Sequence, residues 1–156
     1  MAPSSTKWQT RTVTPFLTAD ILADVPLDVA GSASAGSLIA GDTPVRVGLY
    51  WGAGQDLVRW RANLGQLAGA RFGEESGGNV CGQIARRLEV TVPGHEAHYT
   101  GPAGSGASHT PSEVIVLYAF HAGGTPVVAL YAVAAAERAA HQGDELAFLA
   151  SIKCQP

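Results

Sequence analysis

Residues 113–133 read EVIVLYAFHAGGTPVVALYAV. Two runs of β-branched and aromatic residues, 113–120 and 126–133, flank the segment HAGGT, whose paired glycines permit a tight turn. This is the strongest hairpin signal in the chain. It predicts two antiparallel strands, around which the rest of the fold is expected to assemble.

Working outward, further segments have the alternating apolar and polar residues of strands. In residues 84–92, Ile84, Leu88 and Val90 alternate with Arg87 and Glu89. The other predicted strands are residues 8–14, 20–29 and 45–51, with a short segment at 96–100. Pro26 would confine the strand 20–29 to a sheet edge. Loops or turn-rich connectors are predicted where Gly, Ala and Ser accumulate, at residues 31–42, 74–79 and 101–112.

Two helices are predicted. Leu57, Trp60, Leu64, Leu67 and Arg71 follow one another at steps of three and four, which predicts a helix with one face on a sheet. Gly69 to Gly73 are expected to end it. Asp56 is expected in its first turn, where the helix dipole favours a carboxylate.

The second helix is predicted within residues 134–152. Leu146 and Leu149 form its apolar face, with Phe148 and Ile152 as further candidates, and Gly143 is a candidate break.

The order of strands, helix, strands, hairpin and helix predicts an α+β fold: an antiparallel β-sheet flanked by helices. We expect residues 1–7 to form a disordered polar tail and residues 8–156 to form a single domain.

Composition narrows the function classes. The 156 residues contain 10 Lys and Arg against 13 Asp and Glu, a formal charge of −3. A chain without a basic excess is not expected to bind nucleic acid or an anionic membrane surface. No apolar run has the length of a membrane-spanning helix.

Cys81 and Cys154 are the only cysteines, and they belong to no metal-binding or redox motif. A structural disulfide is the preferred interpretation, and two unrelated buried thiols are the alternative. A disulfide would indicate an extracytoplasmic protein, periplasmic or secreted, whereas free cysteines would indicate the cytoplasm. The N-terminus lacks the features of a signal peptide, so a secreted form is expected to be the mature chain.

The motifs that could carry chemistry are incomplete. His95-Glu96-Ala97-His98 is one residue short of the zinc motif HExxH, and in a strand its two histidines would face opposite sides. The Gly-rich residues 104–109 lack the Lys and the following helix of a phosphate-binding loop. Asp20, Asp24 and Asp28 would be too widely spaced along one strand to hold an ion. We therefore predict no metal site, no cofactor and no catalytic residues.

Aromatic residues give a weaker signal. Tyr50 and Trp51 end a predicted strand and Trp60 lies on the following helix, where they could line an apolar groove or belong to the core. Tyr118 and Phe120 share one strand face, so we expect at least one of them to be buried.

Strand ends and loops carry function more often than cores do. On that ground the candidate binding surface also includes His95, His98, Tyr99 and His121.

Several weak motifs, taken in order, resemble the Mog1/PsbP-like superfamily, which includes LpqN/DcrB-type and Eag-chaperone-like proteins. They are the helix around residues 56–60, the strand leading into Val92-Pro93-Gly94-His95-Glu96-Ala97, the hairpin, and the final Phe148-Leu149-Ala150-Ser151-Ile152. The resemblance covers roughly residues 45–154. It implies an α/β/α sandwich and accessory, binding or chaperone roles without catalysis, and it transfers no site residues.

Three functions follow as hypotheses. The first is a non-catalytic extracytoplasmic, bacterial accessory protein that contacts another protein or an envelope component. The second is a chaperone or immunity-type protein that shields an apolar effector segment with Tyr50, Trp51 and Trp60. The third is a small secreted hydrolase with a site drawn from His95, His98, His109 or His121. The sequence does not indicate the oligomeric state.

Overall fold

The computed structural model describes residues 8–14, 17–22, 27–32, 35–41, 45–101 and 104–154. For the strands within residues 8–30 and 95–110, the description covers the backbone. The expected tail, residues 1–7, lies outside the described residues.

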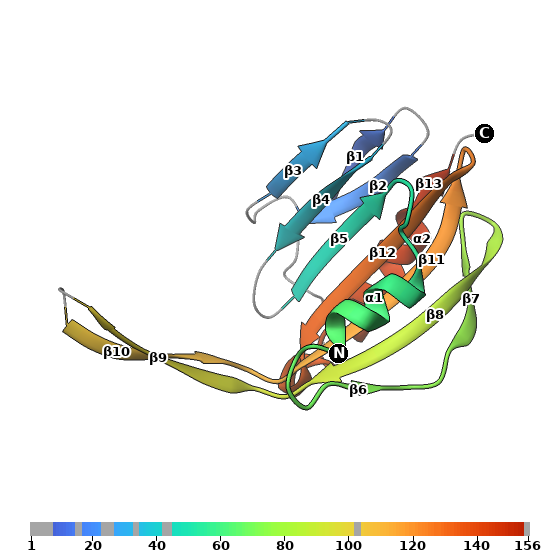
Figure 1. Ribbon diagram of the computed structural model, residues 1–156. Coiled ribbons are helices and arrows are strands. Elements are labelled where there is room, and N and C mark those ends of the chain that lie inside the picture. Colours follow the sequence, from blue (N-terminus) through green and yellow to red (C-terminus); the bar gives the residue numbers. More distant parts are fainter. Residues whose placement is uncertain are drawn as a thin grey trace.

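An antiparallel sheet of eight strands forms the centre of the molecule (Figure 1). Its order is β3-β4-β5-β12-β11-β8-β6, with β7 also paired to β8. The strands are β3 (Leu27–Gly31), β4 (Gly36–Gly41), β5 (Val45–Trp51), β6 (Arg71–Phe72), β7 (Ser76–Val80), β8 (Gln83–Val92), β11 (Glu113–Ala122) and β12 (Thr125–Ala134). The α+β class predicted from the sequence is confirmed.

The predicted hairpin is the middle of this sheet. β11 and β12 pair from Glu113↔Ala134 to Ala122↔Thr125, so the turn consists of Gly123 and Gly124. Both glycines have positive φ, 56° and 81°, which the tight hairpin turn requires and which other residues adopt only with strain.

One helix covers each face of the sheet, which makes two hydrophobic cores. α1 (Leu57–Leu64) buries Leu57 against a core that includes Leu88, Leu117 and Leu130. α2 (Gln142–Ser151) buries Phe148 and Leu149 against the other core, together with Ile152 just beyond the helix. The α/β/α sandwich implied by the resemblance is therefore present.

α1 is shorter than its apolar spacing predicts. Asp56 is the N-cap residue, and its carboxylate accepts a hydrogen bond from the Arg59 amide at 2.8 Å. The helix ends at Gly65, and the next residues form turns that lead to β6, where Arg71 lies. Because the helix stops early, Leu67 is 44% exposed instead of facing the core.

The second predicted helix is divided, but not at Gly143. A 3-10 turn, η1 (Ala135–Glu137), follows β12, and α2 begins after His141 with Gly143 in its first turn. Phe148, Leu149 and Ile152 are buried as expected, whereas Leu146 is 66% exposed, so the predicted role of Leu146 in the core was wrong.

The predicted strand 20–29 is two strands in different sheets. β2 (Leu17–Leu22) lies between β1 (Trp8–Thr14) and β13 (Lys153–Cys154) in a three-stranded sheet, whereas β3 belongs to the main sheet. Asp20 and Asp28 therefore do not share a strand, and Asp24 and Pro26 lie outside the described residues.

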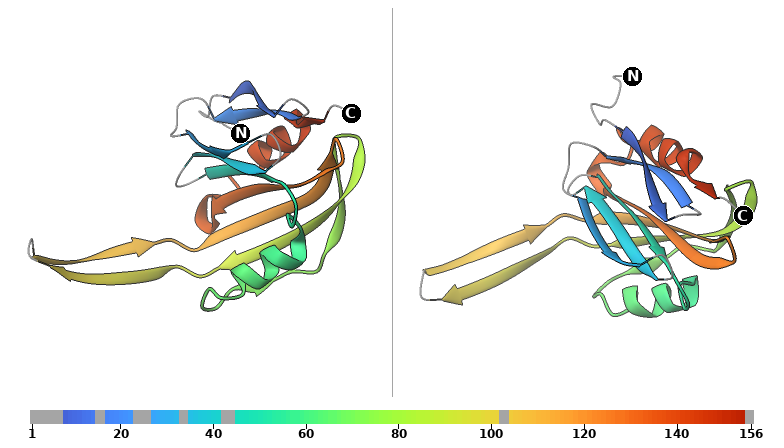
Figure 2. Two further views of the ribbon diagram at one scale, coloured as in Figure 1. Left: turned by 45° about the horizontal axis from the view of Figure 1, so that its top comes forward. Right: turned by 90° about the horizontal axis from the view of Figure 1, so that it is seen from above.

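All three predicted loops contain strands. Residues 31–42 include β4, residues 74–79 include part of β7, and residues 101–112 include β10 (Gly104–Thr110). β10 pairs with β9 (His95–Gly101), and this two-stranded ribbon extends away from the main sheet in every view (Figures 1 and 2). We call β9 and β10 the arm. These strands consist largely of small residues, so their composition predicts loops. They are extended because they pair with neighbouring strands.

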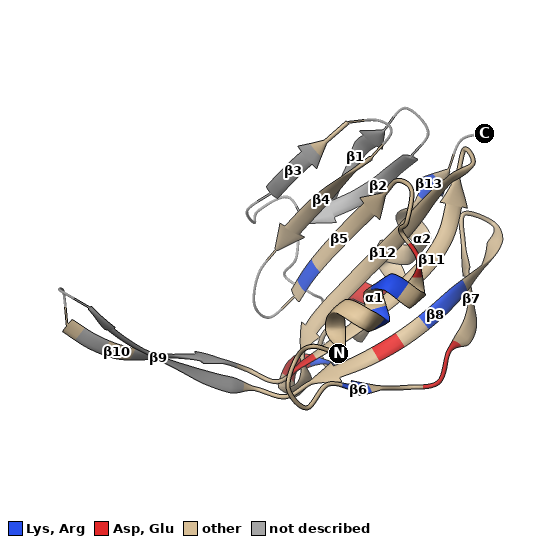
Figure 3. Cartoon of the chain, in the orientation of Figure 1, with Lys and Arg blue, Asp and Glu red and all other residues tan. Residues whose placement is uncertain are grey.

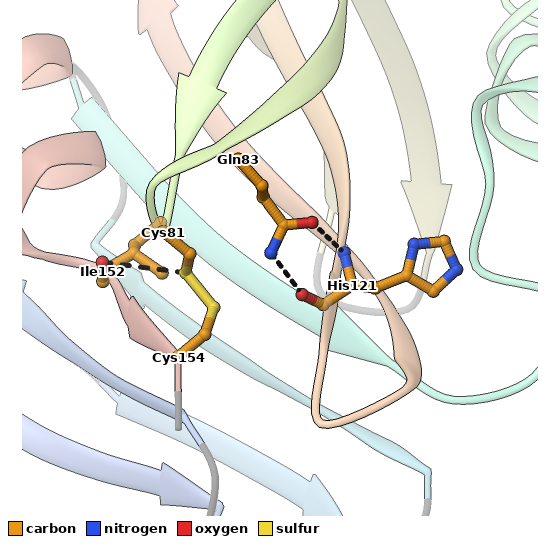
Figure 4. The surroundings of a disulfide bond; sticks show 5 residues. All are labelled: Cys81, Gln83, His121, Ile152 and Cys154. Atoms are coloured by element: carbon orange, nitrogen blue, oxygen red, sulfur yellow. Dashed lines mark hydrogen bonds between the residues drawn. A yellow bond between two sulfur atoms is a disulfide. The ribbon is translucent and has the colours of Figure 1, made fainter. Parts of the chain in front are cut away.

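The predicted disulfide is present between Cys81 and Cys154, whose Cα atoms lie 5.5 Å apart. It joins the β7–β8 turn to β13, and Figure 4 shows its position beside Ile152. Cys81 and its neighbour Gly82 both have positive φ angles, +58° and +69°. A cysteine therefore occupies a left-handed position of a tight turn. Such a disulfide favours an extracytoplasmic, oxidising location.

Candidate binding cleft

A cleft of about 620 Å³ lies beside the C-terminal end of α1, on the α1 face of the main sheet. Its floor comes from the strands and its wall from the turns after α1. The arm begins at its edge. The lining residues are Arg46, Leu64, Gln66, Leu67, Ala68, Val92, Pro93, Gly94, Pro111, Glu113 and Ile115.

The cleft exists because α1 is too short to cover this end of the sheet. Within the sheet, Arg46 and Ile115 lie in register on either side of Ala132, so both occupy the same face. Ile115 is buried, but the helix ends at Leu64 before it reaches the ends of β5, β8 and β11. The turns that follow leave Leu67 at the rim.

One ion pair interrupts the apolar lining. Arg46 Nη2 donates a hydrogen bond to Glu113 Oε1 at 3.2 Å, and the two side chains are 35% and 27% exposed. Both partners remain accessible, so this pair can reorganise towards a bound group. The described lining thus combines mostly apolar side chains with one accessible ion pair.

Tyr50 and Trp60 brace α1 against the sheet. Their rings meet edge to face with centroids 4.7 Å apart, and Trp60 Nε1 donates to Gln55 Oε1 at 3.0 Å. Gly48 leaves room for the Tyr50 ring, because a Cβ atom there would lie 3.0 Å from Tyr50 Cε2. Burial raises the pKa of Tyr50 above its usual value, an effect that Arg46 partly offsets. Both aromatic residues are half-buried in the α1-side core.

Trp51 lies on the other face. Its side chain is 3% exposed and belongs to the core under α2, and its Nε1 donates to the Ser32 carbonyl at 2.7 Å. The structure therefore separates Trp51 from Tyr50 and Trp60, and these three aromatic residues do not line one groove. Tyr118 and Phe120, expected to include a buried member, are both buried.

The histidines of the predicted surface are also dispersed. His121 is exposed near the end of β11 remote from the arm, and its main chain makes two hydrogen bonds with the Gln83 side chain (Figure 4). It lines a second cleft of about 440 Å³ beside the N-terminal end of α1. His95, His98 and Tyr99 lie on β9, where the structure describes the backbone and their side chains lie outside the described part.

Sequence reasoning missed a charged network on the α2 side of β8. Arg87 Nε donates to the Tyr118 hydroxyl at 2.9 Å, and Arg87 also lies 3.7 Å from Glu145 of α2. Glu89, next to it on this face, forms an ion pair with Arg138. Charges of both signs are visible along β8 in Figure 3. The alternation of these charged residues with Leu88 and Val90 predicted a strand but not the partners that α2 and η1 supply.

The pKa values within this network follow from burial and charge. For Glu89, burial opposes ionisation, but the hydrogen bond and charge of Arg138, with Arg87, leave its pKa below the usual value. Burial, assisted by Asp144 and Glu145, raises the pKa of Tyr131. Tyr131 donates to the His141 carbonyl at 2.9 Å, and the His141 ring lies 2.8 Å from Asp144. These contacts fasten α2 to the sheet.

Among residues with described side chains, no His, Cys, Asp and Glu cluster is arranged to hold a metal ion. In the same part of the chain, neither helix has the length and apolar character of a membrane span.

No protein-family model and no curated protein matches this chain. Several solved structures are similar to it, and two of them are described here. LpqN of Mycobacterium tuberculosis, a protein involved in cell envelope biogenesis, is 10% identical, with a TM-score of 0.46 over 98% of this chain and 93% of LpqN. PA94, a Pseudomonas aeruginosa protein of unknown function, is 9% identical, with a TM-score of 0.45 over 89% of this chain and 91% of PA94.

Proposed function

We propose that this chain is a non-catalytic extracytoplasmic binding protein, whose cleft beside α1 receives an apolar side chain from a partner protein. The observation that carries the proposal is the cleft itself: about 620 Å³, mostly apolar, with one accessible ion pair in its wall.

The size and chemistry of the cleft suit this role. Binding sites in proteins commonly measure 300–1,000 Å³ and combine apolar walls with a few polar groups that orient the ligand. Here Leu64, Val92 and Ile115 offer apolar contact, and Arg46 and Glu113 offer one donor and one acceptor. A partner's apolar side chain would bury itself there while its main chain hydrogen-bonds to the ion pair.

Leu67 is the residue that most directly suggests a macromolecular partner. It is exposed at the rim of the cleft, where a partner surface could cover it. Burying a leucine side chain is worth about 1.5–3 kcal/mol, enough to act as a local anchor in a protein interface.

The test uses a phage-displayed peptide library, selected on the oxidised protein without reductant. Selected peptides are synthesised and titrated against the native chain, Leu67→Asp and Leu146→Asp. Both leucines are exposed, but only Leu67 lines the cleft, so the two variants carry the same chemical change at matched surface positions. Leu67→Asp should weaken binding by roughly tenfold or more, whereas Leu146→Asp should leave it unchanged.

The proposal fails if the library yields no binder, or if the two aspartate variants bind the selected peptides equally well. Circular dichroism and thermal unfolding of both variants confirm that a loss of binding is not a loss of fold.

A further inference from the structure

The arm has two strands and two open edges. Within the described strands, β9 and β10 pair with each other and with no third strand. Figure 2 shows the arm clear of the main sheet in both views. A two-stranded ribbon without further strands or a covering helix is at best marginally stable in water, so additional pairing would stabilise the arm.

The arm continues the pairing of β8 and β11 in the same register. Val92 pairs with Glu113 before the interruption, and His95 pairs with Thr110 after it. Pro93 and Pro111 fall in adjacent positions of the gap, one on each strand. Neither proline has an N–H group to donate, so the ladder is interrupted on both strands between these two pairs. The arm is thereby separated from the main sheet that would otherwise support it.

Among the described strands, none lies beside the outer edge of β10. In the main sheet the neighbour of β11 is β12, which ends at Ala134. The Ala135 amide makes one last hydrogen bond, to the Ser112 carbonyl at 2.8 Å, and the chain then turns away into η1. Beyond this point no described strand continues the line of β12. A strand added there would lie beside β10 from Gly104 to Thr110.

The residues of β10 distinguish it from the other edge strands. Proteins usually protect free edges with charged residues, proline or very short strands. The described edge strands β1, β3, β6, β9 and β13 each contain a charged residue, respectively Arg11, Asp28, Arg71, Glu96 and Lys153. β7 is short and ends at the disulfide-bonded turn. β10, with the sequence GSGASHT, contains neither a charged residue nor proline.

We propose that β10 pairs antiparallel with β10 of a second copy of this chain about a two-fold axis. An edge that meets itself doubles any charge it carries, so an uncharged strand of small residues suits self-pairing. The product is a continuous four-stranded sheet made of two arms. If all seven residues pair, Gly104 lies opposite Thr110 of the second copy and Ala107 lies on the axis.

Sedimentation equilibrium of the native chain, through the micromolar range, tests the dimer. The expected mass is twice the chain mass of 16.1 kDa. Ala107→Lys puts two like charges together on the axis and should return the mass to that of the monomer. Ala97→Lys makes the same change on β9, in the same arm but on the remote edge, and should leave the dimer intact.

A second measurement identifies the paired strand even if a lysine disturbs the arm. Ala107→Cys should form a dimer under mild oxidation that a non-reducing gel detects, whereas Ala97→Cys should not. A monomeric native chain, equal dissociation by both lysines, or equal cross-linking by both cysteines would each overturn the proposal. Replacing residues 97–108 by an Asn-Gly turn should also abolish the dimer, and a dimer that survives would place the contact elsewhere.

Discussion

Removing the disulfide should have a cost that depends on which residue replaces Cys81. Cys154→Ser combined with Cys81→Ser opens a covalent loop between residues separated by 73 positions. In the chain-entropy model, a loop of this length stabilises the folded state by about 4 kcal/mol. We expect the double serine variant to lose roughly that amount of unfolding free energy.

The backbone at position 81 adds a second, separable contribution. Its φ of +58° lies in the left-handed region, which costs most residues about 1–2 kcal/mol but is tolerated by asparagine. Cys81→Asn also places asparagine before Gly82, the sequence that tight hairpin turns of this type prefer. Cys154→Ser with Cys81→Asn should therefore be about 1 kcal/mol more stable than the double serine variant.

Urea unfolding, followed by tryptophan fluorescence and circular dichroism, measures all three free energies. The two double variants share Cys154→Ser and lack the cross-link, so their difference isolates residue 81. Equal stabilities for these two variants would refute the argument from the left-handed backbone. A double serine variant within about 1 kcal/mol of the native chain would refute the loop-entropy estimate.

Three further predictions concern α2 and its network. Phe148→Ala should reduce the free energy of unfolding by about 3–5 kcal/mol because the side chain is fully buried. Leu146→Ala should change it by less than about 0.5 kcal/mol because that side chain is exposed. Equal losses for the two variants in urea unfolding would contradict this prediction. The folded pKa of Glu89 lies below its ordinary value of 4.5, so its stabilising contribution is present above that pH and is lost as the pH falls through the folded pKa. Glu89→Gln should make acid destabilisation shallower, and parallel profiles of urea midpoint against pH for variant and native chain would show otherwise. The pKa of Tyr131 is raised in the folded state, so its contribution to folding stability is complete below pH 10.0 and is lost at higher pH. Tyr131→Phe should therefore remove part of the loss of stability at alkaline pH. An unchanged alkaline part of the profile of urea midpoint against pH would exclude this.

The central strands could be predicted because their own residues have the composition of buried strands. β11 and β12 are rich in β-branched and aromatic residues and end at two glycines, so pattern and turn chemistry agree. β4 and β10 were missed because Gly, Ser and Ala favour loops locally. Their extended conformation comes from pairing with neighbouring strands, and no property of a short segment reveals that partner.

Helix ends and covered polar faces were harder to predict for the same reason. Leu67 continues the helical spacing of Leu57 and Leu64, yet Gly65 ends the helix first. Arg87 and Glu89 have the alternation of a strand, which does not predict the partners that α2 and η1 supply. In each case the outcome depends on what packs against the segment.

The cleft could be predicted only in part. Leu64 and Leu67 belonged to the predicted apolar stripe of the helix, but Arg46 and Glu113 are 67 positions apart and no local pattern joins them. They meet because β5 and β11 both pair with β12, so sheet register was the missing information. Of the predicted surface residues, Tyr50 on β5 and Trp60 on α1 pack against each other between the helix and the sheet, which explains their spacing without assigning them to binding.

The disulfide determines what a single proteolytic cleavage in the arm would do to the molecule. Cys81 precedes the arm and Cys154 follows it, so the arm lies inside the covalently closed loop. A protease that cleaves once within the arm would produce two polypeptides that stay joined through sulfur and remain interleaved in the main sheet. Such a nicked molecule would migrate as one species until a reductant separates it. In its native compartment, the protein could therefore lose the continuity of its backbone and keep its architecture.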